Sequence, residues 1–183
     1  MSEIVRLTLL SHAMTDAMAA GRFPADEPLS EIGQRQTQAV PDLGSVDTAV
    51  CGPELRTVQT AERLGLRPRR EPMLADLACG RWRGQLLGDI GPADLAVWLT
   101  DPNGAPHGGE SVAALIGRVR AWLDSVAGHP ERIVAVTHPG VIRAAVVVAL
   151  DAPPTSFWRI DVGPASRTVM HLRAGAWTLR STG

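Results

Sequence analysis

The sequence predicts an α/β protein with three layers, in which a mostly parallel central sheet is flanked by helices. Residues 4–10 and 133–137 are almost continuously apolar, a pattern typical of strands buried on both faces of a parallel sheet. A third observation is the helical spacing of apolar residues over 112–126. A chain of 183 residues can bury about 70 per cent of its unfolded surface, so we expect one domain spanning residues 1–183.

The other elements follow from start and stop signals along the chain. Residues 13–28 mix small, charged, proline and glycine residues and are expected to form a loop with at most one helical turn. Ser30 is expected to cap a helix that Pro41 ends. Gly52 and Pro53 lead from a short strand into another helix, where an early proline suits its missing donor. We expect helices over residues 31–40, 54–64, 93–99, 112–126 and 140–150, and strands over residues 4–10, 46–51, 67–71, 133–138, 158–162, 168–173 and 177–180.

Composition excludes several classes of function. The formal net charge of −1 gives no electrostatic reason to expect nucleic acid or an acidic membrane surface as a partner. The longest apolar stretch, residues 144–150, is far too short to span a bilayer, so we expect a cytoplasmic protein with no membrane partner. Cys51 and Cys79 are too few for a disulfide framework or a cysteine-based zinc site, and buried free thiols are expected.

Two histidines stand at the ends of predicted strands. His12 follows the first apolar strand, and His138 follows the strand that begins near residue 133. Ligands of open α/β sheets collect beyond the carboxyl ends of the strands. A lone histidine there is more often structural than functional, but two histidines brought to the same edge could face each other across a pocket.

Six short motifs extend along almost the whole chain. They are residues 11–15 (Ser-His-Ala-Met-Thr), 28–36 (Pro-Leu-Ser-Glu-Ile-Gly-Gln-Arg-Gln), 52–61 (Gly-Pro-Glu-Leu-Arg-Thr-Val-Gln-Thr-Ala), 74–84 (Leu-Ala-Asp-Leu-Ala-Cys-Gly-Arg-Trp-Arg-Gly), 108–111 (Gly-Gly-Glu-Ser) and 138–143 (His-Pro-Gly-Val-Ile-Arg). In this order the motifs resemble those of the histidine phosphatase superfamily. Each motif alone is weak, and together they predict the phosphoglycerate mutase-like fold of that family.

The resemblance implies a metal-independent phosphomonoesterase that needs no cofactor and acts on a small phosphorylated metabolite through a phosphohistidine intermediate. His12 is the implied nucleophile. Arg56 and His138 are the implied clamp on the phosphoryl group, because a guanidinium fork fits phosphate oxygens well. Asp76 is the implied proton donor and later acceptor, a role for which a pKa raised toward neutrality is best suited. Thr15 is also expected among the substrate-binding residues.

The sequence departs from the family pattern at the phosphate site. Ser11 stands where the family has a phosphate-binding arginine, and Met18 stands where many members have an asparagine. Losing a charge-assisted contact costs about 1.5–3 kcal/mol, so weakened activity is expected. Arg22 or Arg83 is the hypothesised replacement for the missing guanidinium, against the alternative that each is a solvent-facing charge. Ser11 itself stays among the candidate substrate-binding residues.

Two other functions remain open. A catalytically degenerate member could bind a phosphorylated ligand or a partner without turnover, which Ser11 favours and the retained His12, Arg56 and His138 oppose. A phosphoglycerate mutase is less favoured, because mutases usually carry more insertions and a longer tail. The loops that would recognise the leaving group carry no readable code, and the oligomeric state is open, with a homodimer as one alternative.

Overall fold

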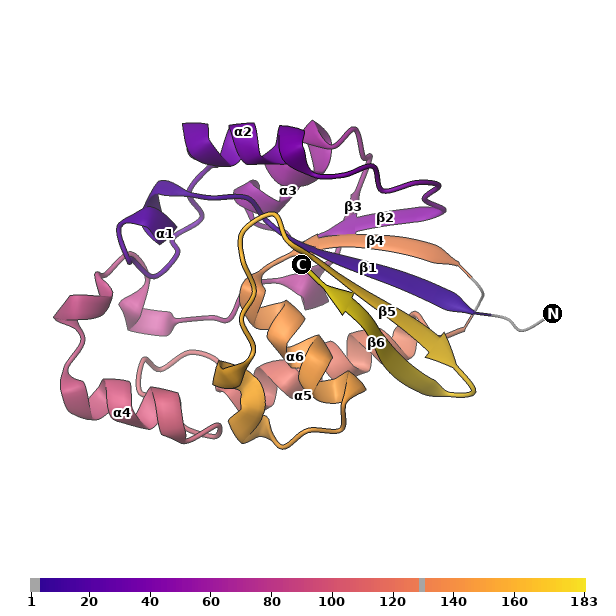
Figure 1. Cartoon of the computed structure of the whole chain (residues 1–183). Coiled ribbons are helices and arrows are strands. Elements are labelled where there is room, and N and C mark those ends of the chain that lie inside the picture. Colours follow the sequence, from indigo (N-terminus) through magenta and orange to yellow (C-terminus); the bar gives the residue numbers. More distant parts are fainter. Residues whose placement is uncertain (1–3, 129–130) are drawn as a thin grey trace.

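The structure, a computed structural model, describes residues 4–128 and 131–183. Six strands form one sheet in the order β3-β2-β4-β1-β5-β6 (Figure 1). The strands are β1 Val5–Ser11, β2 Thr48–Cys51, β3 Arg69–Arg70, β4 Arg132–Thr137, β5 Arg167–Arg173 and β6 Ala176–Thr182. Strands β3, β2, β4 and β1 are parallel, and β5 and β6 extend the sheet with antiparallel pairing. The predicted α/β class with a mostly parallel sheet is confirmed.

Helices cover both faces of the sheet (Figure 1). The α-helices are α1 Asp16–Ala19, α2 Glu31–Ala39, α3 Leu55–Arg63, α4 Pro92–Thr100, α5 Val112–Ser125 and α6 Pro139–Ala149, and the 3-10 helices are η1 Pro72–Leu74, η2 Gly80–Trp82, η3 Leu87–Asp89 and η4 Pro154–Arg159. Helices α5 and α6 pack on one face, whereas α2 and α3 lie on the other. Within residues 4–128 and 131–183, no helix is long and apolar enough to cross a membrane.

The first strand shows why its sequence is apolar without alternation. Leu7 and Leu9 belong to the cluster under α5 and α6, and Leu10 packs with Val58 and Ala61 of α3. Successive residues of a strand point to opposite faces, so a strand covered on both sides needs apolar residues at both sets of positions.

Most predicted elements agree with the structure within a few residues. Ser30 and Ser111 cap α2 and α5, each accepting a hydrogen bond of 3.1 Å from a backbone N–H three residues later. The predicted strand over 158–162 is wrong, because the chain there leaves the 3-10 helix η4 and joins no strand. Pro153 and Pro154 have no N–H to donate to a ladder, and the aromatic residues that follow turn inward instead. Phe157 is only 1 % exposed.

The two cysteines differ in burial. Both are free thiols, and Cys51 is buried in β2 as expected. Cys79 is only partly buried, so the expectation of a buried thiol was wrong for this residue. It lies on a loop that lines a cavity rather than in a strand, and this placement explains the difference.

The register of the parallel strands sets the geometry of the site. Ser11 of β1 is level with Thr137 of β4, so the next residues, His12 and His138, leave the sheet side by side at its carboxyl edge. The backbone N–H of His12 continues the ladder and donates to the carbonyl of Thr137 at 2.8 Å. Strand β2 ends beside β4 at the same edge and leads into α3.

The loop that follows η1 is tied to helix α5 by Arg118. Nη1 of Arg118 donates to the carbonyls of Met73 at 2.6 Å and Ala75 at 3.0 Å, and Nη2 of Arg118 forms an ion pair with Glu110 at 2.8 Å. Carbonyl groups of a loop with no sheet partner are satisfied in this way. The loop is therefore fixed at the edge where both histidines emerge.

Two glycines in helices make a matched test of packing. A Cβ at Gly33 in α2 would lie 2.0 Å from the carbonyl oxygen of Met14, whereas a Cβ at Gly117 in α5 would have no heavy atom within 4 Å. We expect Gly33→Ala to destabilise the protein by about 1–3 kcal/mol through overpacking, and Gly117→Ala to stabilise it by up to about 1 kcal/mol through helix propensity.

Thermal denaturation followed by circular dichroism measures both effects, and a change of 1 kcal/mol moves the Tm by about 2–4 °C in a chain of this size. Equal Tm values for the two variants would contradict the close contact between α2 and the backbone at Met14.

Candidate active site

His12 occupies the end of β1 in a defined tautomeric environment. Its side chain is buried, and Nδ1 lies 2.8 Å from the carbonyl oxygen of Ala13, which can only accept a hydrogen bond. The proton of the neutral ring therefore sits on Nδ1, and Nε2 carries the lone pair. That Nε2 accepts a hydrogen bond of 3.3 Å from Nε of Arg56.

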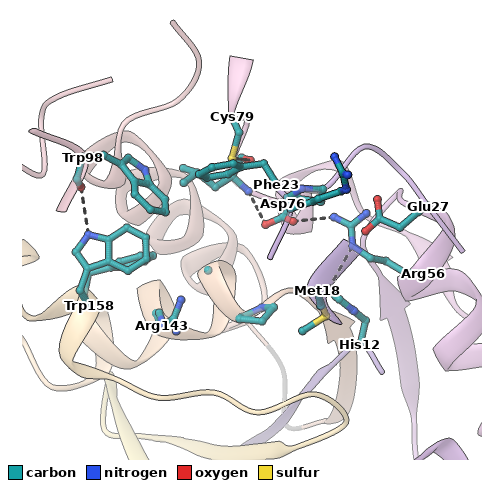
Figure 2. Close-up of a pocket in the computed structure, with 16 residues that line it drawn as sticks. His12, Met18, Phe23, Glu27, Arg56, Asp76, Cys79, Trp98, Arg143 and Trp158 are labelled. Carbon is teal, nitrogen blue, oxygen red and sulfur yellow. Dashed lines mark hydrogen bonds and ion pairs between the residues drawn. The ribbon is translucent and has the colours of Figure 1, made fainter. Parts of the chain in front are cut away.

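Arg56 lies in the first turn of α3 and is 1 % exposed. Besides its contact with His12, its Nη2 forms an ion pair with the carboxylate of Asp76 at 2.7 Å (Figure 2). Its Nη1 is buried and has no hydrogen-bond partner among the described residues. A buried guanidinium that retains an unused donor is unusual, since buried polar groups are normally satisfied. This donor is available to a bound anion.

His138 is the N-cap of α6 and completes the cluster from the second strand end. Its ring centroid lies 5.2 Å from that of His12, with the two ring planes 66° apart. Its Nε2 lies 2.8 Å from a carboxylate oxygen of Glu54, and its Nδ1 lies 3.4 Å from Oδ2 of Asp76. The cluster thus combines two imidazoles with one guanidinium, and His138 lines neither of the two cavities that adjoin Arg56.

Glu54 is a residue that the sequence analysis missed as part of this cluster. Besides its contact with His138, its Oε1 accepts a hydrogen bond of 3.0 Å from the backbone N–H of Asp76. It therefore orients both a histidine and the loop that carries the second carboxylate. Its position two residues before Arg56 was visible in the sequence, but the contact depends on how the distant loop folds back.

The electrostatic surroundings keep His12 neutral. Burial lowers its pKa from 6.5 to about 3, and the neighbouring His138 and Arg56 add to the effect. Removing an imidazolium from water is unfavourable, and the adjacent cationic groups repel a second positive charge. Nε2 of His12 is therefore unprotonated at physiological pH and, among the described residues, accepts a hydrogen bond only from Arg56.

The pKa of Asp76 is lowered, contrary to the raised pKa that would suit a proton donor. Burial alone would raise the pKa of this carboxyl, but His138 and Arg56 outweigh burial and hold the pKa below its usual value. Glu54 behaves similarly, because the hydrogen bond and charge of His138 outweigh burial and lower its pKa. In both carboxyl groups, the nearby positive charges favour the ionised form and so lower the pKa.

Ser11 and Thr15 lie beside the cluster but line neither of the two cavities that adjoin Arg56. Ser11 is fully buried, and its Oγ has no hydrogen-bond partner among the described residues. As a strand residue two positions after Leu9, it points to the face covered by α5 and α6. Thr15 caps α1 and donates to Glu27 at 3.1 Å.

Arg22 and Arg83 lie on exposed loops. Arg22 lines the same cavity as His12, and its Nη1 donates to the carbonyl of Gly84 at 3.2 Å. Arg83 lines the adjoining cavity with Arg56 and Asp76, and its Nη2 donates to the carbonyl of Ala25 at 3.0 Å. Neither has a hydrogen bond or an ion pair with the histidine cluster in this ligand-free structure.

The cavity beside His12 has a volume of about 190 Å³. One end holds His12, Arg56 and Asp76, and the other end is aromatic (Figure 2). Within the described residues, no group of three or more His, Cys, Asp or Glu side chains is arranged to hold a metal ion. The arrangement brings a neutral imidazole, a guanidinium and a carboxylate together in one pocket.

Comparisons with known proteins agree with this geometry. The family model of the histidine phosphatase superfamily (branch 1) matches residues 7–183. Glucosyl-3-phosphoglycerate phosphatase of Mycobacterium tuberculosis is 34 % identical over 94 % of this chain and 86 % of its own length. Phosphoserine phosphatase 1 of Hydrogenobacter thermophilus is 28 % identical over 92 % of this chain and 87 % of its own length.

Solved structures give the same result. A protein described as mycobacterial hydrolase 1 aligns with a TM-score of 0.86 and 28 % identity over 97 % of both chains. The native mycobacterial glucosyl-3-phosphoglycerate phosphatase aligns with a TM-score of 0.83 and 28 % identity over 96 % of this chain and 97 % of its own. Since the family model covers nearly the whole chain, and the strand-end histidines lie in contact at the carboxyl edge of the sheet, this chain belongs to the histidine phosphatase superfamily.

Proposed function

We propose that this protein is a metal-independent phosphomonoesterase that hydrolyses a small phosphorylated metabolite through a phosphohistidine intermediate on His12. The observation that carries the proposal is the state of His12 Nε2, which is unprotonated, faces Arg56 and lies in a cavity open to substrate. Both relatives compared above are named as phosphatases.

In the first step, Nε2 of His12 attacks phosphorus, a nitrogen–phosphorus bond forms and the bond from phosphorus to the alcohol oxygen breaks. Arg56 and His138 supply positive charge and N–H donors to the phosphoryl oxygens, which is the main requirement of phosphoryl transfer. The leaving alkoxide takes a proton from Asp76.

Asp76 must first acquire that proton. A bound phosphoryl dianion would attract the charges of Arg56 and His138 that now lower the pKa of Asp76, and would itself repel a second anion. Both effects raise the pKa of Asp76 when substrate binds. Substrate binding thus converts an ion-paired carboxylate into a proton donor.

In the second step, water attacks the phosphohistidine and transfers a proton to Asp76. The nitrogen–phosphorus bond breaks, inorganic phosphate forms and His12 returns to its neutral state. The reaction uses side chains of this chain alone and needs no cofactor.

The same residues bear on the two alternative functions, binding without turnover and mutase activity. The buried and unpaired Nη1 of Arg56 favours an anion-binding site in any case. The unprotonated Nε2 of His12 favours turnover over binding alone. We place hydrolysis above mutase activity. We also propose that the protein is cytoplasmic and that its partner is a small molecule rather than nucleic acid or a membrane.

Replacing the nucleophile tests the function directly. We expect His12→Ala to reduce kcat for 4-nitrophenyl phosphate by more than about a thousandfold, as is usual when a covalent nucleophile is removed. His171→Ala is the matched control, because His171 lies in β5 opposite Arg6 at the far end of β1. Turnover that survives in His12→Ala would exclude this nucleophile, and wild-type protein without turnover would favour the binding alternative.

The pKa of His12 is a separate prediction. With a pKa of about 3, its ring should stay neutral and protonated on Nδ1 throughout the range above about pH 4.5. Nitrogen–proton correlation spectra of labelled ligand-free protein, assigned with His12→Ala, measure this state. A titration midpoint near the ordinary 6.5 would contradict the arrangement around His12.

The same shift predicts how stability depends on pH. The unfolded chain binds a proton at this histidine below about pH 6.5, whereas the folded chain does so only near pH 3. Wild-type protein should therefore lose stability relative to His12→Ala as the pH falls through this window.

Glu54 is expected to act as a positioning residue. Glu54→Gln keeps the shape of the side chain but removes the charged acceptor from His138, so kcat should fall by roughly 10- to 100-fold with a smaller change in KM. Glu62→Gln, an exposed change on the same helix, is the control. Steady-state kinetics and a melting curve separate catalysis from folding, and equal kcat values in the two variants would exclude the role.

A further inference from the structure

The cavity continues beyond the phosphoryl end into an aromatic chamber. Its walls include Phe23, Trp98, Phe157 and Trp158, which contact one another as ring pairs. The ring centroids of Trp98 and Trp158 are 4.4 Å apart, and the indole N–H of Trp158 donates to the carbonyl of Trp98 at 3.3 Å. The chamber is therefore a defined surface and not a loose collection of side chains.

Arg143 lies among these rings and lines the same cavity. It lies on α6 one turn after Pro139, so the two residues share the helix face that lines the cavity. Its Nε donates to the carbonyl of Ile160 at 2.8 Å, and its guanidinium carbon lies 5.5 Å from the ring centroid of Trp158 and 5.9 Å from that of Phe157. The hydrogen bond to Ile160 and the contacts with the two aromatic rings thus fix the orientation of the guanidinium plane.

The outer edge of this guanidinium is unused. Among the described residues, neither Nη1 nor Nη2 of Arg143 has a hydrogen-bond partner, and no carboxylate lies within 4.0 Å. Burial lowers the pKa of Arg143, and the charges of Asp161 and Asp76 only partly oppose this effect. Arg143 is only partly buried, so its Nη groups are accessible from the cavity and can donate to an anionic ligand there.

We propose that Arg143 and the surrounding aromatic rings form a second subsite, which binds a carboxylate on the alcohol part of the substrate. The proposal rests on the proposed function of the His12 end and specifies its substrate class. The substrate is a phosphomonoester of an aromatic or otherwise flat apolar alcohol that carries a carboxylate at its far end.

The shape and charge of the subsite select this class. The two free Nη groups present parallel donors that match the two oxygens of a carboxylate. One guanidinium charge balances one carboxylate, whereas a second phosphoryl dianion would leave negative charge against aromatic walls. Arg143 and Trp158 lie at the end of the pocket away from His12 and Arg56 (Figure 2), so one molecule occupies both ends with its apolar body between them.

Binding to a variant that cannot turn over tests the subsite. In His12→Ala, isothermal titration calorimetry compares 4-carboxyphenyl phosphate, and its homologues with one and two methylene groups before the carboxylate, with the carboxamide of each. Acids of three lengths are compared because the carboxylate must reach Arg143 while the phosphate lies beside Arg56. We expect at least one acid to bind roughly 10- to 100-fold more tightly than its amide, the range for a charge-assisted pair.

Substitutions then assign the preference to Arg143. Adding Arg143→Met should abolish the preference for the acid and leave binding of the amide nearly unchanged. Arg120→Met, an exposed change on α5, is the control and should keep the preference. If Arg143→Met does not fold by circular dichroism, Arg143→Lys retains the charge without the planar fork and should weaken the preference.

The outcomes separate the two proposals. The absence of any acid preference, or a preference that persists without Arg143, would overturn the subsite even if His12-dependent hydrolysis is observed. An acid preference that depends on Arg143 would support the subsite even if the wild-type protein hydrolyses no phosphomonoester.

Discussion

The buried guanidinium of Arg56 is the interaction on which the site depends. It contacts His12 and Asp76, which come from different segments of the chain, and it keeps one buried donor without a partner. A buried cation with a single carboxylate partner creates positive potential that attracts an anion, and it adds to burial and to His138 in keeping a proton off His12. The parallel register of β1 and β4 brings His12 and His138 to the same edge of the sheet. The short turn from β2, which pairs with β4, into α3 brings Arg56 to that edge.

The sequence predicted the fold well where local patterns agree with tertiary burial. Strand β1 is covered on both faces, so its apolar run is also its structural requirement, and the serine caps of α2 and α5 bond their own helices. Residues 158–162 were assigned wrongly, because aromatic residues favour strands in general. Here they belong to a segment that two prolines turn toward a cavity, and no local pattern distinguishes a strand from such a segment.

The site was predicted in part for the same physical reason. The two histidines follow strand ends, and Arg56 lies in the first turn of a helix. Parallel topology brings all three residues to the same edge of the sheet. Glu54 was not assigned, because its contacts depend on how a loop crosses the carboxyl edge, and no spacing along the chain encodes that path. The charge state of Asp76 was also beyond the sequence, since it results mainly from His138 and Arg56, which are distant in the chain.

The central claim is that an oxyanion replaces Asp76 as a main partner of Arg56 and sits against His12. A crystal structure of the wild-type protein with vanadate, a mimic of the transferring phosphoryl group, measures this most directly. We expect vanadium bonded to Nε2 of His12, with Arg56 and His138 donating to its oxygens and Nη1 of Arg56 no longer unpaired. Vanadate bound elsewhere, with Nε2 of His12 free and the Arg56–Asp76 contact unchanged at full occupancy, would contradict the account.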